Sequence, residues 1–388
     1  MFKNSYIIVS VFLLFTSGIY AFDFSSVDEI VKAGVVNKSY PGAQLLIGDT
    51  KGTVYSKCYG TYTYDSESPL VAESSIFDLA SLTKVVAVTS CIMTLYEAGK
   101  LDLNDFAGKY IPEFNENGKE NITLLNLLLH NSGLKAWEPF YKYCSNKQDV
   151  LNAIYKIGLE YPTGTAFVYS DLNFIILGDV VEKVSGESLD TYCEKNIFKP
   201  LKMESTMFNP PDKLKKYALP TETDNNLRKR LLQGEVHDEA AWMLKGVSGN
   251  AGLFSNSEDL SKFMNMMINR GFYHNPYSRG LKEEKLFKTA TVDYFTSKFN
   301  TKDYVNTRAP GWDTKPEPTS YRSPCGELIS ENSFGHTGFT GTSIWCDKER
   351  GVYVIFLTNR TYPNRKSNGI REIRPEIHNE IIKIISNN

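Results

Sequence analysis

The chain has 388 residues, of which 41% are hydrophobic and 23% charged, and its 45 Asp and Glu against 43 Lys and Arg give a net charge of −2. This composition is typical of a folded globular protein and excludes a disordered chain, a collagen-like chain and a polytopic membrane protein. The near-zero net charge provides no basic surface for nucleic acid.

The first 21 residues have the order of segments found in a secretory signal peptide. Lys3 supplies a positive charge, residues 6–15 are almost wholly apolar, and Ala21 is a small residue suited to cleavage. An uncleaved membrane anchor is the alternative, but an anchor needs about 20 apolar residues and this run is shorter. We therefore expect residues 1–21 to be removed during export to the periplasm or the exterior, which leaves residues 22–388 as the mature protein.

The beginning of the mature chain is predicted to form a helix and a β-hairpin. The helix occupies about 26–36, because Ser26 and Glu29 fit a capping box. The hairpin consists of two strand-like stretches, 43–47 and 53–59, separated by a short turn.

A helical middle follows, and strands return only near the end of the chain. Gly99 stands where the C-terminus of a helix requires a left-handed residue. The main helices expected from apolar spacing are 81–98, 123–130, 171–184 and 189–198. Two late strands are expected at 342–346 and 352–357, and Pro375 is expected to open a final helix.

This order predicts an α/β (α+β) fold with one antiparallel sheet built from both chain ends. No βαβα alternation occurs, which excludes a doubly wound parallel sheet. The terminal helices are expected to cover one face of the sheet and the helical middle the other. We place the sheet region at about 22–80 and 285–388 and the helical region at about 81–284, with a ligand cleft between them.

The first candidate motif is S-x-x-K at Ser81 and Lys84. Positions i and i+3 of a helix share a face, so the serine hydroxyl and the lysine amine can meet. A serine becomes a nucleophile when a neighbouring base takes its proton, and a desolvated lysine can have its pKa lowered enough to serve. A solvated lysine one turn from a capping serine is the alternative, but the apolar residues on both sides indicate a buried helix.

The second motif is Tyr169-Ser170-Asp171, at the start of the helix expected at 171–184. A tyrosine there can share a proton with Lys84 and pass it to a leaving group. Taken alone, the motif also fits a helix N-cap formed by Ser170 or Asp171, with Tyr169 as a packing residue.

The third motif is His336-Thr337-Gly338, within the glycine-rich stretch 333–341. Glycines allow a ligand to approach the backbone closely at a strand edge. The backbone N–H groups of Ser81 and Phe339 are then placed to form an oxyanion hole. A glycine-rich turn before a strand is the alternative.

Together, S-x-x-K, Y-S-D and H-T-G in this order and spacing resemble the serine β-lactamase and penicillin-binding protein superfamily. The chain is most similar to its class C-like branch, which includes DD-peptidases, D-amino-acid peptidases and carboxylesterases. The resemblance covers nearly the whole mature chain and includes the stretches 127–134, 249–255 and 334–345. It implies the sheet-plus-helical fold predicted above.

The resemblance also implies a role for each motif residue. Ser81 would accept the acyl group, Lys84 would be the base and Tyr169 the proton relay. His336 and Thr337, with Gly338, Phe339 and Asp171 beside them, would bind a carboxylate or carbonyl of the substrate.

Two of these positions differ from the antibiotic-hydrolysing pattern. Asp171 replaces an asparagine and His336 replaces a lysine. An acidic Asp171 lacks an amide donor, and His336 is mostly neutral at pH 7 and therefore a weaker anion partner than lysine. Both argue against efficient β-lactam hydrolysis, while the acyl-transfer chemistry remains.

A finer resemblance concerns residues 234–239, Trp242 and residues 359–363, which look like a bacterial subgroup of cell-wall peptidases and amidases. That subgroup includes DD-carboxypeptidases and enzymes that cut the N-acetylmuramyl–L-alanine amide bond. His237 is therefore a candidate substrate contact. A surface or N-capping cluster on a loop is the alternative for this segment.

The remaining features indicate neither a metal nor a nucleotide cofactor. The histidines and the six cysteines lack metal-ligand spacing, and no glycine-rich nucleotide fingerprint follows a strand. Secretion would allow disulfides, but the spacing does not indicate a disulfide scaffold.

The sequence therefore predicts an exported serine hydrolase acting on a small peptide, muropeptide or ester, most like a DD-carboxypeptidase, with β-lactams as possible covalent ligands. A muramyl–L-alanine amidase, a carboxylesterase and a non-catalytic peptide- or penicillin-binding module are the competing hypotheses.

Overall fold

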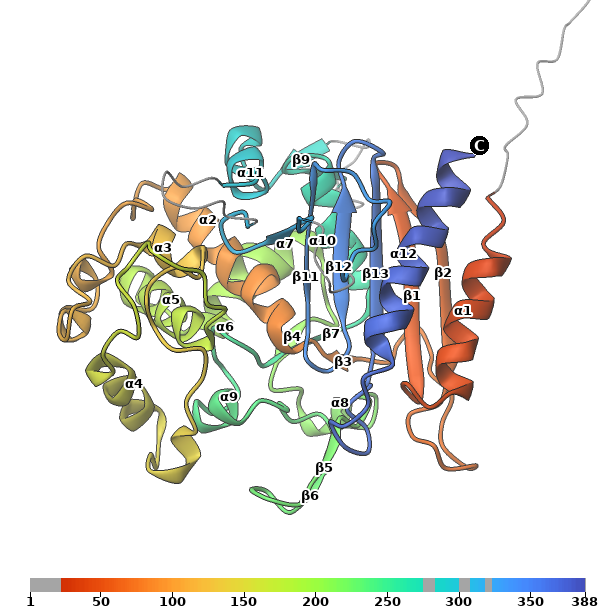
Figure 1. Cartoon of the computed structure of the whole chain (residues 1–388), viewed down its shortest axis with the longest axis horizontal. Coiled ribbons are helices and arrows are strands. Elements are labelled where there is room, and N and C mark those ends of the chain that lie inside the picture. Colours follow the sequence, from red (N-terminus) through yellow and green to blue (C-terminus); the bar gives the residue numbers. More distant parts are fainter. Residues whose placement is uncertain (1–21, 275–282, 300–307, 318–322, 388) are drawn as a thin grey trace, which may run out of the picture.

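The computed structural model describes residues 22–274, 283–299, 308–317 and 323–387, so the predicted signal peptide lies outside the described residues. Its centre is a six-stranded sheet in the order β10-β11-β12-β13-β1-β2, with every neighbouring pair antiparallel. The strands come from both ends of the chain, as the red and blue arrows of Figure 1 show. They are β1 (Gly42–Asp49), β2 (Gly52–Gly60), β10 (Asp313–Thr314), β11 (Ser333–Thr337), β12 (Ser343–Asp347) and β13 (Val352–Thr358). The predicted fold class is confirmed.

Helices cover both faces of this sheet, which explains why every residue of β13 is buried. Successive side chains of a strand point to opposite faces. Leu45 of β1 packs in a cluster with Val31 of α1 (Ser25–Val36) and Ile377 of α12 (Ile370–Ser386). The neighbouring Leu46 belongs to the main core.

The second face of the sheet is covered by α10 (Ser257–Ile268), whose Phe263 and Met266 are fully buried in the main core. Asn265 of α10 also donates to the backbone carbonyl of Asp49 at 3.0 Å. The helical region expected at about 81–284 therefore includes one helix that packs on the sheet.

The capping of the first helix and the start of the last helix differ from the prediction. Ser26 does not cap α1: the Asp23 carboxylate accepts from the Ser25 N–H, and the Ser26 hydroxyl donates to Glu380 of α12. Pro375 lies inside α12, which begins at Ile370. Ile370 is buried in the same cluster as α1, so packing against the core extends the helix upstream of its proline.

The remaining helices lie mainly beside the sheet, to its left in Figure 1. The helix expected at 81–98 is a composite of a 3-10 turn η1 (Ala80–Leu82), a π-helical segment η2 (Lys84–Thr89) and α2 (Ser90–Glu97), followed by Gly99 at φ +65°. The one expected at 189–198 is divided between α6 (Leu189–Cys193) and the π-helical η6 (Glu194–Phe198). The other helical segments are η3 (Ala107–Lys109), η4 (Pro112–Phe114), α3 (Leu124–Leu128), η5 (Phe140–Lys142), α4 (Lys147–Lys156), α5 (Asp171–Ser185), α7 (Lys199–Leu201), α8 (Asp212–Lys215), α9 (Glu239–Met243) and α11 (Thr289–Phe295).

Several short strands lie within or at the edges of the part of the chain that was expected to be helical. They are β3 (Phe77–Asp78), β4 (Met207–Phe208) and β7 (Leu253–Ser255), which form a three-stranded sheet, and the pairs β5 (Glu222–Asp224) with β6 (Arg230–Leu232) and β8 (Phe272–His274) with β9 (Glu283–Lys285). Strands of two or three residues are too short to show the alternation on which sequence patterns depend. Within the described residues, no helix has the length and apolar character needed to cross a membrane.

Candidate active site

Ser81 lies in the tight turn that follows β3. Ala80, the residue before it, has a left-handed backbone with φ +46°, a conformation that strains a residue with a Cβ. The buried Asp78 carboxylate holds this turn by accepting from the Ala80 N–H at 2.8 Å. The local backbone therefore fixes the position of Ser81 before any substrate is present.

Lys84 is fully buried one turn after Ser81, and its ammonium makes three hydrogen bonds. It donates to Ser81 Oγ at 3.0 Å, to Asp171 Oδ1 at 2.7 Å and to the Asn250 carbonyl at 2.8 Å. The first motif and the start of α5 are thus brought together, as their predicted roles require. The hypothesis of a solvated Lys84 is wrong.

The charge state of Lys84 differs from the expectation that burial would lower its pKa. Burial alone does lower it, but the Asp171 carboxylate at 2.7 Å and the Tyr169 side chain outweigh that effect and raise the pKa to about 12. Lys84 therefore rests as an ammonium at neutral pH and must lose a proton before it can accept one from Ser81.

Tyr169 faces Lys84, with the amine nitrogen 5.1 Å from the centroid of its ring. Its hydroxyl is buried and has no hydrogen-bond partner among the described residues. Burial raises the pKa of the phenol, an effect that the neighbouring Lys84 charge opposes. Tyr169 thus presents a protonated hydroxyl beside Lys84, as the predicted proton relay requires.

His130 fixes the backbone beside Tyr169. Its ring stacks on the Tyr169 ring with centroids 4.5 Å apart, and Nδ1 accepts from the Ser170 N–H at 3.0 Å. Because burial holds the pKa of His130 well below its usual value, the ring is neutral and available as an acceptor.

His336 lies on β11, opposite Ile344 of β12, with its ring 5.9 Å from the Tyr169 ring. Burial lowers the pKa of His336 to about 4, so it is neutral at pH 7. Its Nδ1 lies 2.9 Å from the Thr337 carbonyl, a contact that assigns the proton to Nδ1. The buried Nε2, which has no partner among the described residues, is then a hydrogen-bond acceptor and not a cationic anchor.

The loop after β11 packs directly against the turn that carries Ser81. A Cβ on Gly338 would meet the Leu79 carbonyl at 2.4 Å, so only glycine fits there. Thr340 donates to the Asp78 carbonyl at 2.7 Å. Phe339 is 47% exposed, and nothing in the described part of the chain accepts a hydrogen bond from its N–H. A backbone N–H without a protein acceptor is one feature that the predicted oxyanion hole requires.

His237 is neither a surface residue nor a helix cap. It is buried, its Nε2 lies 2.9 Å from Glu222, and its backbone N–H donates to Asp78 at 2.6 Å. Its ring packs against Phe339 with centroids 5.6 Å apart. The N-cap of α9 is instead Asp238, which accepts from the Ala241 N–H.

Arginine side chains complete the surroundings of Phe339. Arg360 donates to the Phe339 carbonyl at 2.7 Å, and its guanidinium carbon lies 4.6 Å from the ring centroid. Arg365 makes a forked ion pair with Glu222. Burial raises the pKa of that carboxyl, but the hydrogen bonds with His237 and Arg365 outweigh burial and lower it to about 2. Arg360 therefore holds the backbone and the ring of Phe339 in place, although the side chain is partly exposed.

Three residues to which the sequence motifs assigned no role connect the site. Asp78 binds both the Ser81 turn and the His237 segment, Asn250 binds Lys84, and Asp238 accepts from the Asn250 amide at 3.0 Å. Asn250 belongs to the glycine-rich stretch 249–255, so the sequence did contain a signal for it. Asp78 had none, since a single aspartate before an apolar helix is common.

Sheet, helical region and site together define a class of protein: a hydrolase that uses a serine next to a buried lysine. Comparison with known proteins agrees. The family profile described as Beta-lactamase matches residues 27–376, and the chain belongs to this family. It is a serine hydrolase.

Two relatives are similar over most of their length. The chain is 34% identical over 368 residues to an N-acetylmuramyl-L-alanine amidase of Bacillus subtilis (strain 168), covering 87% of this chain and 80% of that protein. It is 33% identical over 360 residues to a Salmonella agona protein named "Putative D-alanyl-D-alanine carboxypeptidase", covering 84% and 80%. Among solved structures, a penicillin-binding protein homologue from Caulobacter crescentus superposes with a TM-score of 0.69 at 18% identity, over 91% of this chain and 96% of that one, which shows a shared fold.

Proposed function

We propose that this chain is an exported hydrolase that cleaves an amide bond of a cell-wall peptide through an acyl-enzyme on Ser81. The observation that carries the proposal is the fully buried Lys84 amine 3.0 Å from the Ser81 hydroxyl. A buried cation needs a reason, because desolvation penalises it. Activation of Ser81 is a functional reason for placing this lysine in the core.

The proposed reaction uses each group at a stated atom. Lys84, once deprotonated, takes the Ser81 proton as Oγ attacks the carbonyl carbon of the substrate. The N–H groups of Ser81 and Phe339 donate to the developing oxyanion. The Tyr169 hydroxyl gives its proton to the leaving amine and recovers one from Lys84, and water then releases the acyl group from Ser81.

The electrostatics favour a scissile amide without a carboxylate beside it. The Lys84 ammonium is already paired with Asp171, and His336 is neutral with Nε2 as an acceptor, so neither side chain offers a free cation to a substrate carboxylate. A terminal D-Ala-D-Ala substrate places its carboxylate next to the scissile bond, whereas an N-acetylmuramyl–L-alanine bond is followed by a further peptide bond. The muramyl–L-alanine amide is therefore our first candidate, and similarity to the Bacillus subtilis amidase supports it.

The DD-carboxypeptidase activity expected from the sequence is the second candidate. Arg308 is buried near the site, with its guanidinium carbon 5.8 Å from the Tyr169 ring centroid. A substrate carboxylate there would compete with Asp313, which already pairs with Arg308. Similarity to the Salmonella protein supports this candidate.

One digestion separates the two activities. An N-acetylmuramyl pentapeptide ending in D-Ala-D-Ala is incubated with the protein, and the products are identified by mass spectrometry. Release of the intact pentapeptide supports the amidase, and release of free D-alanine supports the carboxypeptidase. Ser81→Ala is the control and should yield neither product, whereas product formation by this variant at the wild-type rate would contradict both.

An esterase and a non-catalytic binding module would give different results with the same protein. A carboxylesterase would turn over short acyl esters and leave the muropeptide intact. A non-catalytic binding module would bind muropeptide without forming product. A β-lactam should acylate Ser81 slowly, because Asp171 and His336 replace the residues of the antibiotic-hydrolysing pattern.

A further inference from the structure

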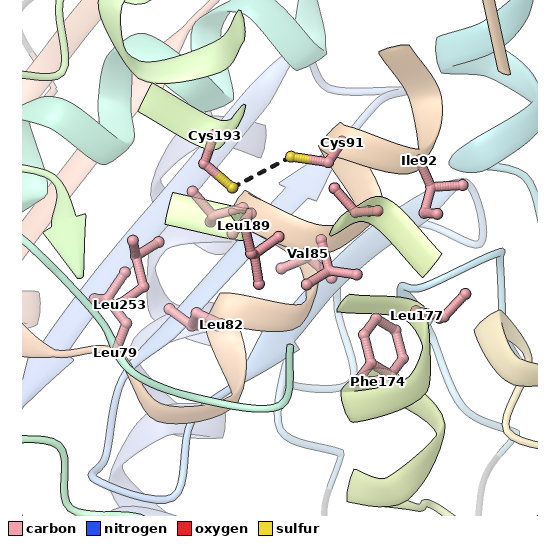
Figure 2. Close-up of a cluster of buried hydrophobic side chains, with 14 of the residues drawn as sticks. Leu79, Leu82, Val85, Cys91, Ile92, Phe174, Leu177, Leu189, Cys193 and Leu253 are labelled. Carbon is pink, nitrogen blue, oxygen red and sulfur yellow. Dashed lines mark hydrogen bonds between the residues drawn. The ribbon is translucent and has the colours of Figure 1, made fainter. Parts of the chain in front are cut away.

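Cys91 and Cys193 meet in the core behind the site. Cys91 is on α2 and Cys193 on α6, and their sulfur atoms lie 3.2 Å apart. Neither residue has any exposed surface. Figure 2 shows the two sulfurs pointing at each other among Leu82, Val85 and Leu189.

The two sulfurs lie close enough to form a disulfide bond with little movement of the chain. All six cysteines are free thiols in the structure. A disulfide has an S–S distance of about 2.05 Å, so the two sulfurs need to approach by only about 1.2 Å. Among the described residues, the side-chain hydrogen bond of each sulfur is to the other sulfur.

We propose that Cys91 and Cys193 are joined by a disulfide in the mature protein. Both thiols are oxidised, each losing a proton and together two electrons to an external disulfide, which is reduced to two thiols. This oxidant is of the kind present outside the cytoplasm, so the natural occurrence of the bond rests on the export in the proposed function.

The bond has to form while the chain folds. Burial raises the pKa of the Cys193 thiol well above its usual value, and exchange requires the thiolate. In the closed core the pair is therefore inert both to oxidants and, once oxidised, to reductants. Oxidation must precede the packing of α6 on α2.

The cross-link would steady the segment that carries the proposed nucleophile. α2 follows directly from η1 and η2, which hold Ser81 and Lys84. The bond closes a loop between residues 102 positions apart. Cross-links over loops of this length restrict the unfolded chain strongly, which for a protein of this size corresponds to a rise in Tm of about 3–6 °C.

The test uses residues 22–388, so that it does not depend on export. The reduced, denatured protein is refolded in a glutathione redox buffer, denatured again and alkylated, and its mass is measured. We expect four alkyl groups on the six cysteines, a proteolytic fragment that links Cys91 to Cys193, and a Tm about 3–6 °C above that of protein refolded in reductant.

Matched variants assign the bond. Cys91→Ala should take five alkyl groups, because Cys193 is left as a thiol, whereas Cys346→Ala should take three and keep the linked fragment. Six groups on the refolded wild type, or a link between other cysteines, would overturn the proposal. If Cys91→Ala does not fold, the number of alkyl groups on the wild type and its Tm values after refolding in redox buffer and in reductant decide the question. If the wild type still carries six thiols after refolding in the redox buffer and nevertheless turns over muropeptide, the disulfide is overturned and the proposed function stands.

Discussion

Replacing Asp171 by asparagine should move the activity of this hydrolase to lower pH. The substitution keeps the side-chain size and removes the carboxylate that lies 2.7 Å from the Lys84 amine and helps to raise its pKa to about 12. An opposite charge at such a distance shifts a pKa by about 1–3 units. The pKa of Lys84 should therefore fall to between about 9 and 11.

The rate follows from the fraction of Lys84 that is deprotonated. At a pH below the Lys84 pKa of both proteins, each unit by which this pKa falls raises the deprotonated fraction about tenfold. At pH 8, Ser81 of the Asp171→Asn variant should then be acylated by a neutral ester about 10- to 1000-fold faster than Ser81 of the wild type. Its rising limb of kcat/KM against pH should lie about 1–3 units lower.

The assay is a pH series from 6 to about 10.5 on a neutral acyl ester, which has no ionising group of its own. Asp212→Asn is the matched control, because it removes an exposed carboxylate that also pairs with a lysine, Lys215, and it should leave the profile unchanged. A folded Asp171→Asn protein whose limb does not move, or whose activity is lost at every pH, would refute the reasoning. Loss at every pH would indicate that Asp171 rather than Lys84 is the proton acceptor, whereas an unmoved limb would show that Asp171 does not set the pKa of the base.

Three further outcomes are expected. Asp78→Asn should slow acylation at least tenfold, because it weakens the acceptor that holds the Ala80 N–H; a lower Tm with unchanged acylation would contradict this. Burial lowers the pKa of His378 to about 3, so the stability that its neutral ring contributes above pH ~6.5 is lost as the pH falls. His378→Gln should therefore reduce the slope of the unfolding free energy against pH between pH 6.5 and 4 by about 1.4 kcal/mol per unit, as measured in urea. An equal slope in both proteins would argue against this. Phe339→Ala should raise KM for the muropeptide and leave KM for a small ester unchanged, whereas equal increases would exclude selective contact.

The sequence predicted the elements that follow from long apolar patterns and the motifs that lie on them. The hairpin at 43–59 and the strands at 342–346 and 352–357 match β1, β2, β12 and β13 within two residues. Ser81, Lys84 and Tyr169 meet in space as their motifs indicated. The i, i+3 spacing within a helix was enough to predict that Ser81 meets Lys84. The order of the motifs along the chain added the third residue of the group.

What the sequence did not reveal depends on distances between remote segments. The charge of Lys84 is set by Asp171, which is 87 positions away, and no local pattern contains the 2.7 Å separation that decides it. Asp78 has its role because two other segments, at Ala80 and His237, turn their N–H groups towards it. Likewise, the start of α12 is set by packing of Ile370 against α1 and not by Pro375.

The most direct test of the central claim is the mass of the protein during turnover. Wild-type protein is mixed with the muropeptide, quenched in acid within milliseconds, and analysed intact and after proteolysis. The account predicts a transient mass increase equal to the acyl part of the substrate, located on Ser81, and absent from Ser81→Ala. Turnover of the muropeptide with no adduct at any time, or with an adduct on another residue, would contradict it.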